Sequence, residues 1–236
     1  MKKSHIATLI VFLVLIPLTL ILGSRLSGRA FYVTSTLVIV ELLIPFFLAF
    51  EGRRPQAREL VVLAVMCALA VAGRVAIPIP SFKAIFGIIM IAGIAFGPES
   101  GFLVGAISAL ASNFFYSQGP YTPWQMMAYG AGGMLAGFVF ARGRLPRKPV
   151  IMGIFGFLAV TFFVGPLLDT CSVFLVMSRI TLKGAMAFYI SGFPVNLRQA
   201  VATAIVLLVL GKPLLEKLDR IKTKYGILDD EGRKEA

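Results

Sequence analysis

The sequence predicts an all-α integral membrane protein. Of its 236 residues, 58% are hydrophobic and only 14% are charged, whereas about a quarter of a typical soluble domain is charged. Apolar stretches long enough for the roughly 20 helical residues that cross a bilayer core recur along the whole chain. These stretches are continuous and lack the alternation of a membrane β-barrel, so they are expected to be helices.

Eight hydrophobic segments are expected, in two groups. A charged, proline-containing loop at 51–59 separates the first two segments from the other six. We therefore predict an N-terminal two-helix transmembrane hairpin at 1–50, a six-helix membrane core at 51–211 and a cytoplasmic tail at 212–236. In chain order, the segments are 6–23, 30–50, 60–78, 84–97, 101–115, 125–141, 150–177 and 185–211.

Three of the core segments have features of their own. The fourth and fifth are short, and only the four residues 97–100 separate them, which predicts a tight helical hairpin. The seventh is long and carries Pro166 and Asp169, so a bend is expected there.

The basic residues predict how the chain is oriented in a bacterial inner membrane, because Lys and Arg are enriched in cytoplasmic loops. With the N-terminus inside and eight alternating spans, sixteen of the 23 basic residues fall in cytoplasmic segments and five fall outside. Both termini are therefore expected in the cytoplasm. The net charge of +12 is spread over loops that flank apolar segments, which does not indicate binding to nucleic acid.

An uncharged aromatic loop at 116–125 is the first candidate for a ligand site. It combines two prolines and a glycine with Tyr116, Tyr121 and Trp124, the only tryptophan of the chain. Flat aromatic faces with hydrogen-bonding edges suit a neutral or ring-bearing ligand. An interfacial aromatic belt that anchors helices at the lipid headgroups is an equally good interpretation.

Polar residues inside apolar segments are the second candidate. Charged side chains in a membrane are costly, and they are usually paired or line a cavity. Asp169 would offset Arg74 or Arg198, and a buried ion pair that fixes helix packing is the alternative to a ligand site. The residues concerned are Arg74, Asn113, Asp169, Asn196 and Arg198.

Small residues spaced four apart predict close contacts between helices. Ala64, Ala68 and Ala72 share one face of the third segment, and glycine pairs at 101/105 and 133/137 do the same on the fifth and sixth. Packing within the chain is the simplest interpretation of each.

Enzyme motifs are missing from the sequence. It contains no phosphate-binding loop, no H-E-x-x-H and no G-x-S-x-G, and its only histidine, His5, is predicted to be cytoplasmic. We therefore predict no catalytic residue, no cofactor and no metal site. If the protein moves a solute uphill, the ATPase must be another chain.

Residues 51–210 resemble the substrate-binding S components of energy-coupling factor (ECF) vitamin transporters. The stretches 64–74, 78–80, 96–105, 112–115 and 119–126 carry this resemblance. It implies a six-helix core that captures a vitamin from outside and delivers it together with a transmembrane coupling subunit and two cytosolic ATPase subunits. It also implies that an alanine-rich face on the first core helix, here Ala64, Ala68 and Ala72, meets the coupling subunit.

The vitamin pocket of this family lies near the outer face, formed by late helices and external loops. The segment 50–59 and the aromatic loop look most like the cobalamin subgroup, so cobalamin is the expected ligand, with riboflavin or a queuosine precursor as alternatives. The candidate ligand-binding residues are Arg74, Phe82, Asn113, Tyr116, Tyr121, Trp124, Gln125 and Asn196.

Two other classes of protein compete with this interpretation. A stand-alone secondary transporter would show inverted repeats with broken helices in corresponding positions. An intramembrane enzyme would need a nucleophile with its base, or a metal cluster. The sequence shows neither pattern.

Overall fold

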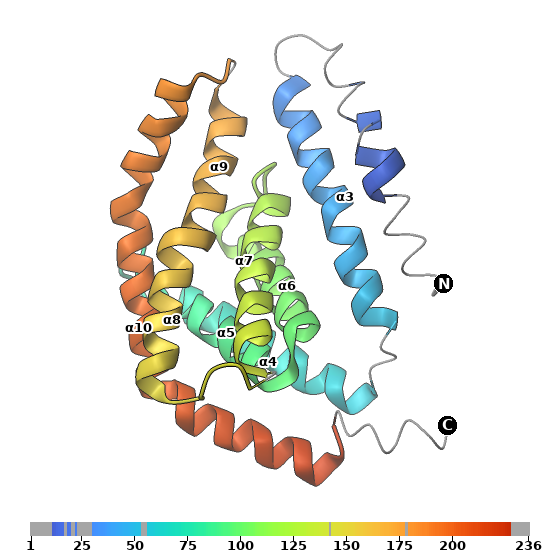
Figure 1. Cartoon of the computed structure of the whole chain (residues 1–236), viewed down its shortest axis with the longest axis vertical. Coiled ribbons are helices and arrows are strands. Elements are labelled where there is room, and N and C mark those ends of the chain that lie inside the picture. The colour runs from blue at the N-terminus through green and yellow to red at the C-terminus, as the bar shows by residue number, and fades with distance from the viewer. Residues whose placement is uncertain are drawn as a thin grey trace.

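The computed structural model describes residues 11–16, 18–19, 22, 30–52, 56–141, 143–177 and 179–227, and these form a bundle of helices (Figure 1). Half of the first predicted segment, 6–23, lies outside them. The elements are η1 (Val11–Leu15), α3 (Ala30–Gly52), α4 (Ala57–Val75), α5 (Ile85–Phe96), α6 (Pro98–Tyr116), α7 (Thr122–Ala136), η2 (Gly137–Ala141), α8 (Pro149–Ala159), η3 (Val160–Val164), α9 (Gly165–Val176) and α10 (Leu182–Tyr225), where η denotes a π-helical turn.

Helix α5 lies at the centre of the bundle. All of its twelve residues are buried, and α4, α6, α7 and α10 pack around it. Its sequence is apolar on every side, which is typical of a fully buried helix. At about 18 Å it is shorter than a bilayer core, so its ends lie among other parts of the protein.

The tight hairpin predicted for the fourth and fifth segments is confirmed. Helices α5 and α6 are separated by Gly97 alone, which has φ 96°. Glycine adopts this conformation without the steric penalty of a Cβ. Pro98 then starts α6, where its missing N–H costs no helical hydrogen bond.

The predicted glycine pairs bring α6 and α7 into backbone contact. A Cβ on Gly101 would lie 2.7 Å from the carbonyl carbon of Gly133, and a Cβ on Gly133 would lie 2.7 Å from that of Gly101. Gly105 similarly faces the backbone of Tyr129. These small residues therefore serve packing within the chain.

The seventh predicted segment is one helix with an irregular middle. It runs from Pro149 to Val176, and the π-helical turn η3 ends immediately before Gly165 and Pro166. A π turn adds a residue to the helix and is a recognised cause of kinks. The irregularity thus lies where the sequence predicts a bend.

Among the residues that the structure describes, two helices are long and apolar enough to cross a membrane, Pro149–Val176 and Leu182–Tyr225, while the apolar stretches Thr36–Leu48 and Ile85–Phe96 are shorter. The arrangement of two plus six spans stays a prediction.

The chain does not leave the helix at residue 212, where we expected the cytoplasmic tail to begin. Helix α10 continues through Pro213 to Tyr225, and this last part runs across one end of the bundle (Figure 1). We call residues 212–225 the C-terminal strap. It packs on the core because Leu215 and Leu218 are buried there, with Ile227 just beyond it.

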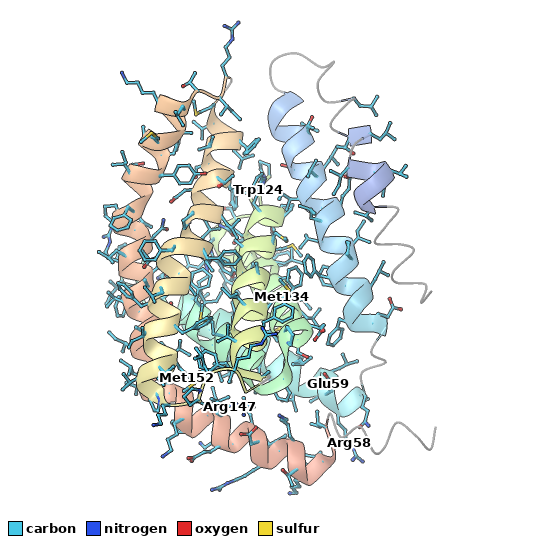
Figure 2. The ribbon with its side chains drawn as sticks, viewed as in Figure 1. Arg58, Glu59, Trp124, Met134, Arg147 and Met152 are labelled. Atoms are coloured by element: carbon cyan, nitrogen blue, oxygen red, sulfur yellow. The ribbon has the colours of Figure 1, made fainter. Side chains whose placement is uncertain are left out.

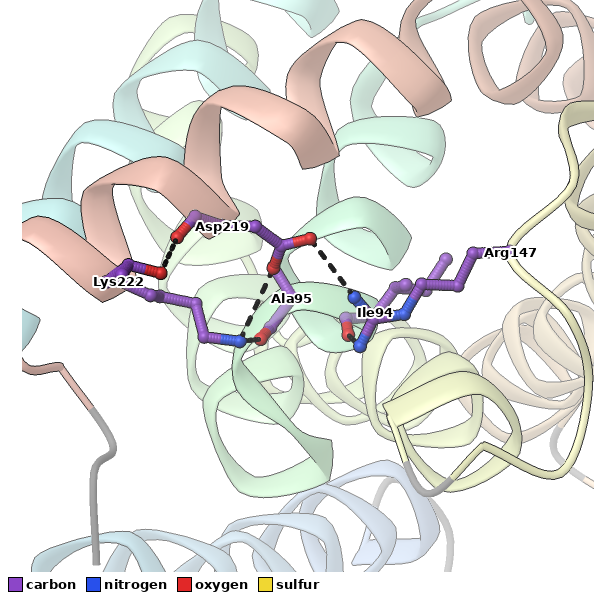
Figure 3. A network of polar contacts seen from close by, with 6 residues as sticks. Ile94, Ala95, Arg147, Asp219 and Lys222 are labelled. Carbon is purple, nitrogen blue, oxygen red and sulfur yellow. Dashed lines mark hydrogen bonds and ion pairs between the residues drawn. The ribbon is translucent and has the colours of Figure 1, made fainter. Parts of the chain in front are cut away.

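Charged side chains join the strap to the end of α5 (Figure 3). Lys222 donates to the carbonyl of Ala95 at 2.7 Å, and Arg147 donates to that of Ile94 at 3.2 Å. Asp219 lies between them, 3.6 Å from Lys222 and 3.4 Å from Arg147. The last carbonyls of a helix lack partners within it, so these two cations satisfy the end of α5.

The N-terminal helix α3 packs against α6, α7 and α9. Phe46 stacks on Phe102 with ring centroids 4.2 Å apart, and Thr36 donates to the carbonyl of Pro120 at 3.4 Å. An exposed apolar row faces away from the core: Val33, Leu37, Val40 and Ile44.

Candidate functional site

A cavity of about 280 Å³ opens between the last turn of α4, the start of α5, the end of α6 and the first half of α10, with α7, η3 and α9 completing its walls. Its polar lining residues are Arg74, Ser81, Lys83, Asn196 and Gln199. The other lining residues are Phe86, Tyr116, Tyr129, Val160, Gly165, Leu168 and Val195. An apolar cavity with a few convergent polar groups is the usual form of a small-molecule site.

Arg74 is fixed on one wall by neutral partners. Its Nη1 donates to Ser112 Oγ and, at 3.0 Å, to Asn113 Oδ1. Its guanidinium carbon lies 4.9 Å from the ring centroid of Tyr116 and 5.6 Å from that of Tyr129. The Tyr116 hydroxyl donates to the Arg74 carbonyl at 3.1 Å. Hydrogen bonds and two aromatic faces therefore position the charge.

Asn113 and Gln125 support Arg74 from behind and do not line the cavity. Asn113 is fully buried, and its Nδ2 donates to Gln125 Oε1 at 2.8 Å and to Thr122 Oγ1 at 3.1 Å. Its Oδ1 is thereby oriented towards Arg74. A buried network with every member paired holds one geometry.

Lys83 lies in the loop between α4 and α5, two residues before α5 begins. Its Nζ donates to the carbonyl of Ile77, and it lies 6.0 Å from the ring centroid of Tyr116. Gln199 of α10 donates to the Lys83 carbonyl at 2.7 Å. Ser81 has φ 57°, uncommon for a residue with a side chain. The loop is thus held in a defined conformation at the cavity.

Asp169 does not offset Arg74 or Arg198 as the sequence suggested. Its Oδ2 accepts a hydrogen bond from Asn196 Nδ2 at 2.7 Å, and the described residues place no cation in an ion pair with it. Arg198 instead donates to the carbonyl of Pro194 at 3.3 Å. The amide is the nearer partner because α9 and α10 pack side by side there.

Besides Asn113 and Gln125, three further predicted ligand residues are not among those that line the cavity. Trp124 is buried beside Ile39 and Cys171 and stacks on Phe174, with ring centroids 5.5 Å apart. The Tyr121 hydroxyl donates to the carbonyl of Ser117 at 2.8 Å. The third, Phe82, is half-buried in the loop before α5.

Of the predicted ligand residues, Arg74, Tyr116 and Asn196 are the three that line the cavity. Sequence reasoning missed Ser81, Lys83 and Gln199 among its polar residues. Lys83 is the one charged residue between Arg74 and Glu99, and this was the available signal.

The predicted alanine face lies on the outside of the bundle. Ala64, Ala68 and Ala72 are all exposed. Ala68 and Ala72 line an open apolar groove together with residues of α6, including Phe115. The groove is free to receive an apolar surface in the part of the chain that the structure describes.

A family model described as the ECF-type riboflavin transporter, S component, matches residues 55–216. The chain matches no curated protein and no solved structure. The matched region contains every residue that lines the cavity and excludes α3.

Proposed function

Because the chain belongs to the family of ECF-type riboflavin transporter S components, we propose that it captures riboflavin or a close flavin relative from outside a bacterial cell. The family consists of substrate-binding subunits of a membrane transporter and not of enzymes. A multi-pass membrane protein is in keeping with the long apolar helices.

The size of the cavity is the observation that favours a flavin. About 280 Å³ is near the lower limit of the roughly 300–1,000 Å³ typical of small-molecule sites. A three-ring flavin approaches this size, whereas a corrin ring with its nucleotide loop is several times larger. Cobalamin, expected from the subgroup resemblance, is therefore the second candidate.

The lining of the cavity also suits a flat heteroaromatic ring. Tyr116, Tyr129 and Phe86 supply aromatic surface, and Asn196 and Gln199 supply amide groups. Rings stack or pack edge-on against such surfaces, and amides can pair with the polar edge of a flavin.

Equilibrium binding to the detergent-purified protein tests the ligand. Flavin fluorescence should fall on binding, and an excess of riboflavin should displace the bound flavin while cobalamin, thiamine and biotin do not. If the protein prefers cobalamin, the flavin is the wrong ligand, but the proposal of a vitamin-capture subunit still stands.

Tyr116 and Tyr121 form a matched pair of variants. Tyr116 lines the cavity and Tyr121 does not, although both lie in the aromatic loop. Tyr116→Ala should cost about 2 kcal/mol of binding, roughly thirtyfold in affinity. Tyr121→Ala should leave affinity unchanged. A larger loss of affinity in Tyr121→Ala than in Tyr116→Ala would place the ligand outside the cavity, against Tyr121.

We further propose that a transmembrane coupling subunit docks on the alanine face and that two cytosolic ATPases drive transport. Side chains as small as Ala64, Ala68 and Ala72 allow close approach of another helix. Ala68→Leu should prevent assembly with the coupling subunit and abolish transport, while the isolated chain still binds its ligand. If this variant assembles normally, the groove faces lipid and is not the docking surface.

A further inference from the structure

On the basis of the proposed flavin site, we propose that the cavity selects an anionic ligand, whose acidic group is held between Arg74 and Lys83. For a flavin this ligand is riboflavin 5′-phosphate and not the neutral vitamin. The same chemistry would apply to any ring-bearing vitamin with a phosphate or carboxylate.

The first support is an excess of positive charge in the cavity. Arg74 and Lys83 line it, and no carboxylate does. The hydrogen-bond partners of both cations are neutral: two side-chain oxygens for Arg74 and a backbone carbonyl for Lys83. Within the described residues neither takes part in an ion pair. Charged groups inside a membrane protein are costly unless they are paired, so two such cations indicate a ligand that supplies the counter-charge.

The second support is that hydrogen-bond donors remain available. Among the described contacts, Arg74 uses only Nη1, so Nε and Nη2 are left, and Lys83 uses one of its three N–H groups. An arginine fork matches the oxygens of a phosphate or carboxylate, and an ammonium group binds phosphate as a point charge.

The third support is that both charges converge on one ring. The guanidinium carbon of Arg74 lies 4.9 Å from the Tyr116 ring centroid, and Lys83 Nζ lies 6.0 Å from it. Helix α5 begins two residues after Lys83, and the partial charge at a helix N-terminus has the same sign. One acidic group beside Tyr116 can therefore interact with both cations.

Asp169 does not cancel this charge. Its Oδ2 accepts a hydrogen bond from the cavity residue Asn196, on the α9–α10 side. The alternative role for the cations is to donate hydrogen bonds to the carbonyl oxygens of a neutral ring. That role predicts no preference for a phosphate group.

Paired titrations of the purified full-length protein with riboflavin and riboflavin 5′-phosphate separate the two roles. The phosphate ester should bind at least about tenfold more tightly, because hydrogen bonds to charged groups are stronger than neutral ones. Lys83→Gln should reduce this ratio of affinities by about tenfold. Asn113→Asp should reduce it as well, since Asn113 Oδ1 lies 3.0 Å from Arg74 Nη1 and the new carboxylate would neutralise the guanidinium. Lys212→Gln, an exposed charge on the strap, is the control and should leave the ratio unchanged.

The outcomes distinguish this inference from the proposed function. If riboflavin binds as tightly as riboflavin 5′-phosphate, or more tightly, the proposal of an anionic ligand is wrong, while the proposal of a flavin site still stands. If neither flavin binds, the flavin proposal fails. The comparison of an acidic with a neutral ligand is then made with two other pairs: nicotinate with nicotinamide, and pyridoxal phosphate with pyridoxine. Tighter binding of the acidic member supports the inference. Preference for a neutral member or for cationic thiamine, or no binding in any pair, refutes it.

Discussion

Trp124 shows how a single side chain can suit both a ligand site and a core. Its indole is buried and stacks on Phe174, and its Nε1 has no hydrogen-bond partner within the described residues. A buried donor without a partner costs about 1–3 kcal/mol. Figure 2 shows Trp124 towards one end of the bundle, with Arg58 and Arg147 towards the other.

Two substitutions at Trp124 separate packing from ligand contact. Trp124→Phe removes the unpaired donor and keeps most of the stacking, so the melting temperature should hold or rise. Trp124→Ala should lower stability by about 3–5 kcal/mol. Thermal unfolding and ligand titration measure both effects, and affinity should change less than about threefold in either variant. A large loss of affinity in Trp124→Ala with unchanged melting would instead place the indole on the ligand.

At the residue scale, sequence reasoning points to cavity-lining residues where a residue contrasts with its neighbours. Arg74 and Asn196 interrupt apolar segments, and both line the cavity. Tyr116, Tyr121 and Trp124 share one loop, yet of these three only Tyr116 lines the cavity. Their roles depend on helix rotation, which spacing within one loop does not fix. The bond that anchors the Lys83 loop comes from Gln199, far along the chain, and no local pattern indicates it.

Close packing of α6 on α7 depends on missing side chains. A Cβ on Gly133 would meet the backbone of Gly101, which can yield only if the helices move apart. A Cβ on the adjacent Gly132 would meet a methyl group of Val164 at 2.9 Å, and a side-chain terminus can shift. Gly133→Ala should therefore lower stability by more than the about 1–3 kcal/mol typical of overpacking, and Gly132→Ala by less. Equal melting temperatures for the two variants would show that the interface is loose.

The strap offers a second prediction at the scale of elements. Lys222→Met would leave the Ala95 carbonyl without its described side-chain partner, and an unpaired buried carbonyl costs about 1–3 kcal/mol. Lys217→Met, an exposed position on the same helix, should change stability by less than about 0.5 kcal/mol. Thermal unfolding of the two variants in detergent provides the measurement. If Lys222→Met leaves the stability unchanged, water must replace the lysine as the hydrogen-bond donor to the Ala95 carbonyl.

The strap also shows why element boundaries are harder to predict than elements. We expected the tail to begin at residue 212, but the helix continues through Pro213, although proline removes a helical hydrogen bond. Packing outweighs this cost, since Leu214, Leu215, Leu218 and Ile221 place an apolar face against the core. The 3.6-residue spacing of these side chains was visible in the sequence, but the surface that they cover was not.

The whole molecule has two chemically different ends, on opposite sides of α5. Lys83 precedes the first turn of α5, so the cavity lies at that end. Arg147 and Lys222 contact its last turn, so the strap lies at the other. The strap end gathers further basic residues, among them Arg144, Lys148, Lys212, Lys217, Arg220 and Lys224. The positive-inside rule therefore predicts that the strap lies in the cytoplasm and that the cavity opens to the outside, which capture of an external vitamin requires.

Labelling of single cysteines tests this orientation. Cys67 and Cys171 are buried, and alanine at both positions gives a background without thiols. Gln118 lies in the loop at the cavity end and Arg144 in the loop at the strap end, and both are exposed. In intact cells, a membrane-impermeant maleimide should label Gln118→Cys, and it should label Arg144→Cys only after permeabilisation. The reverse pattern would place the cavity in the cytoplasm, where it could not receive a vitamin from outside, and would turn the proposed importer subunit into a protein that binds its ligand inside the cell.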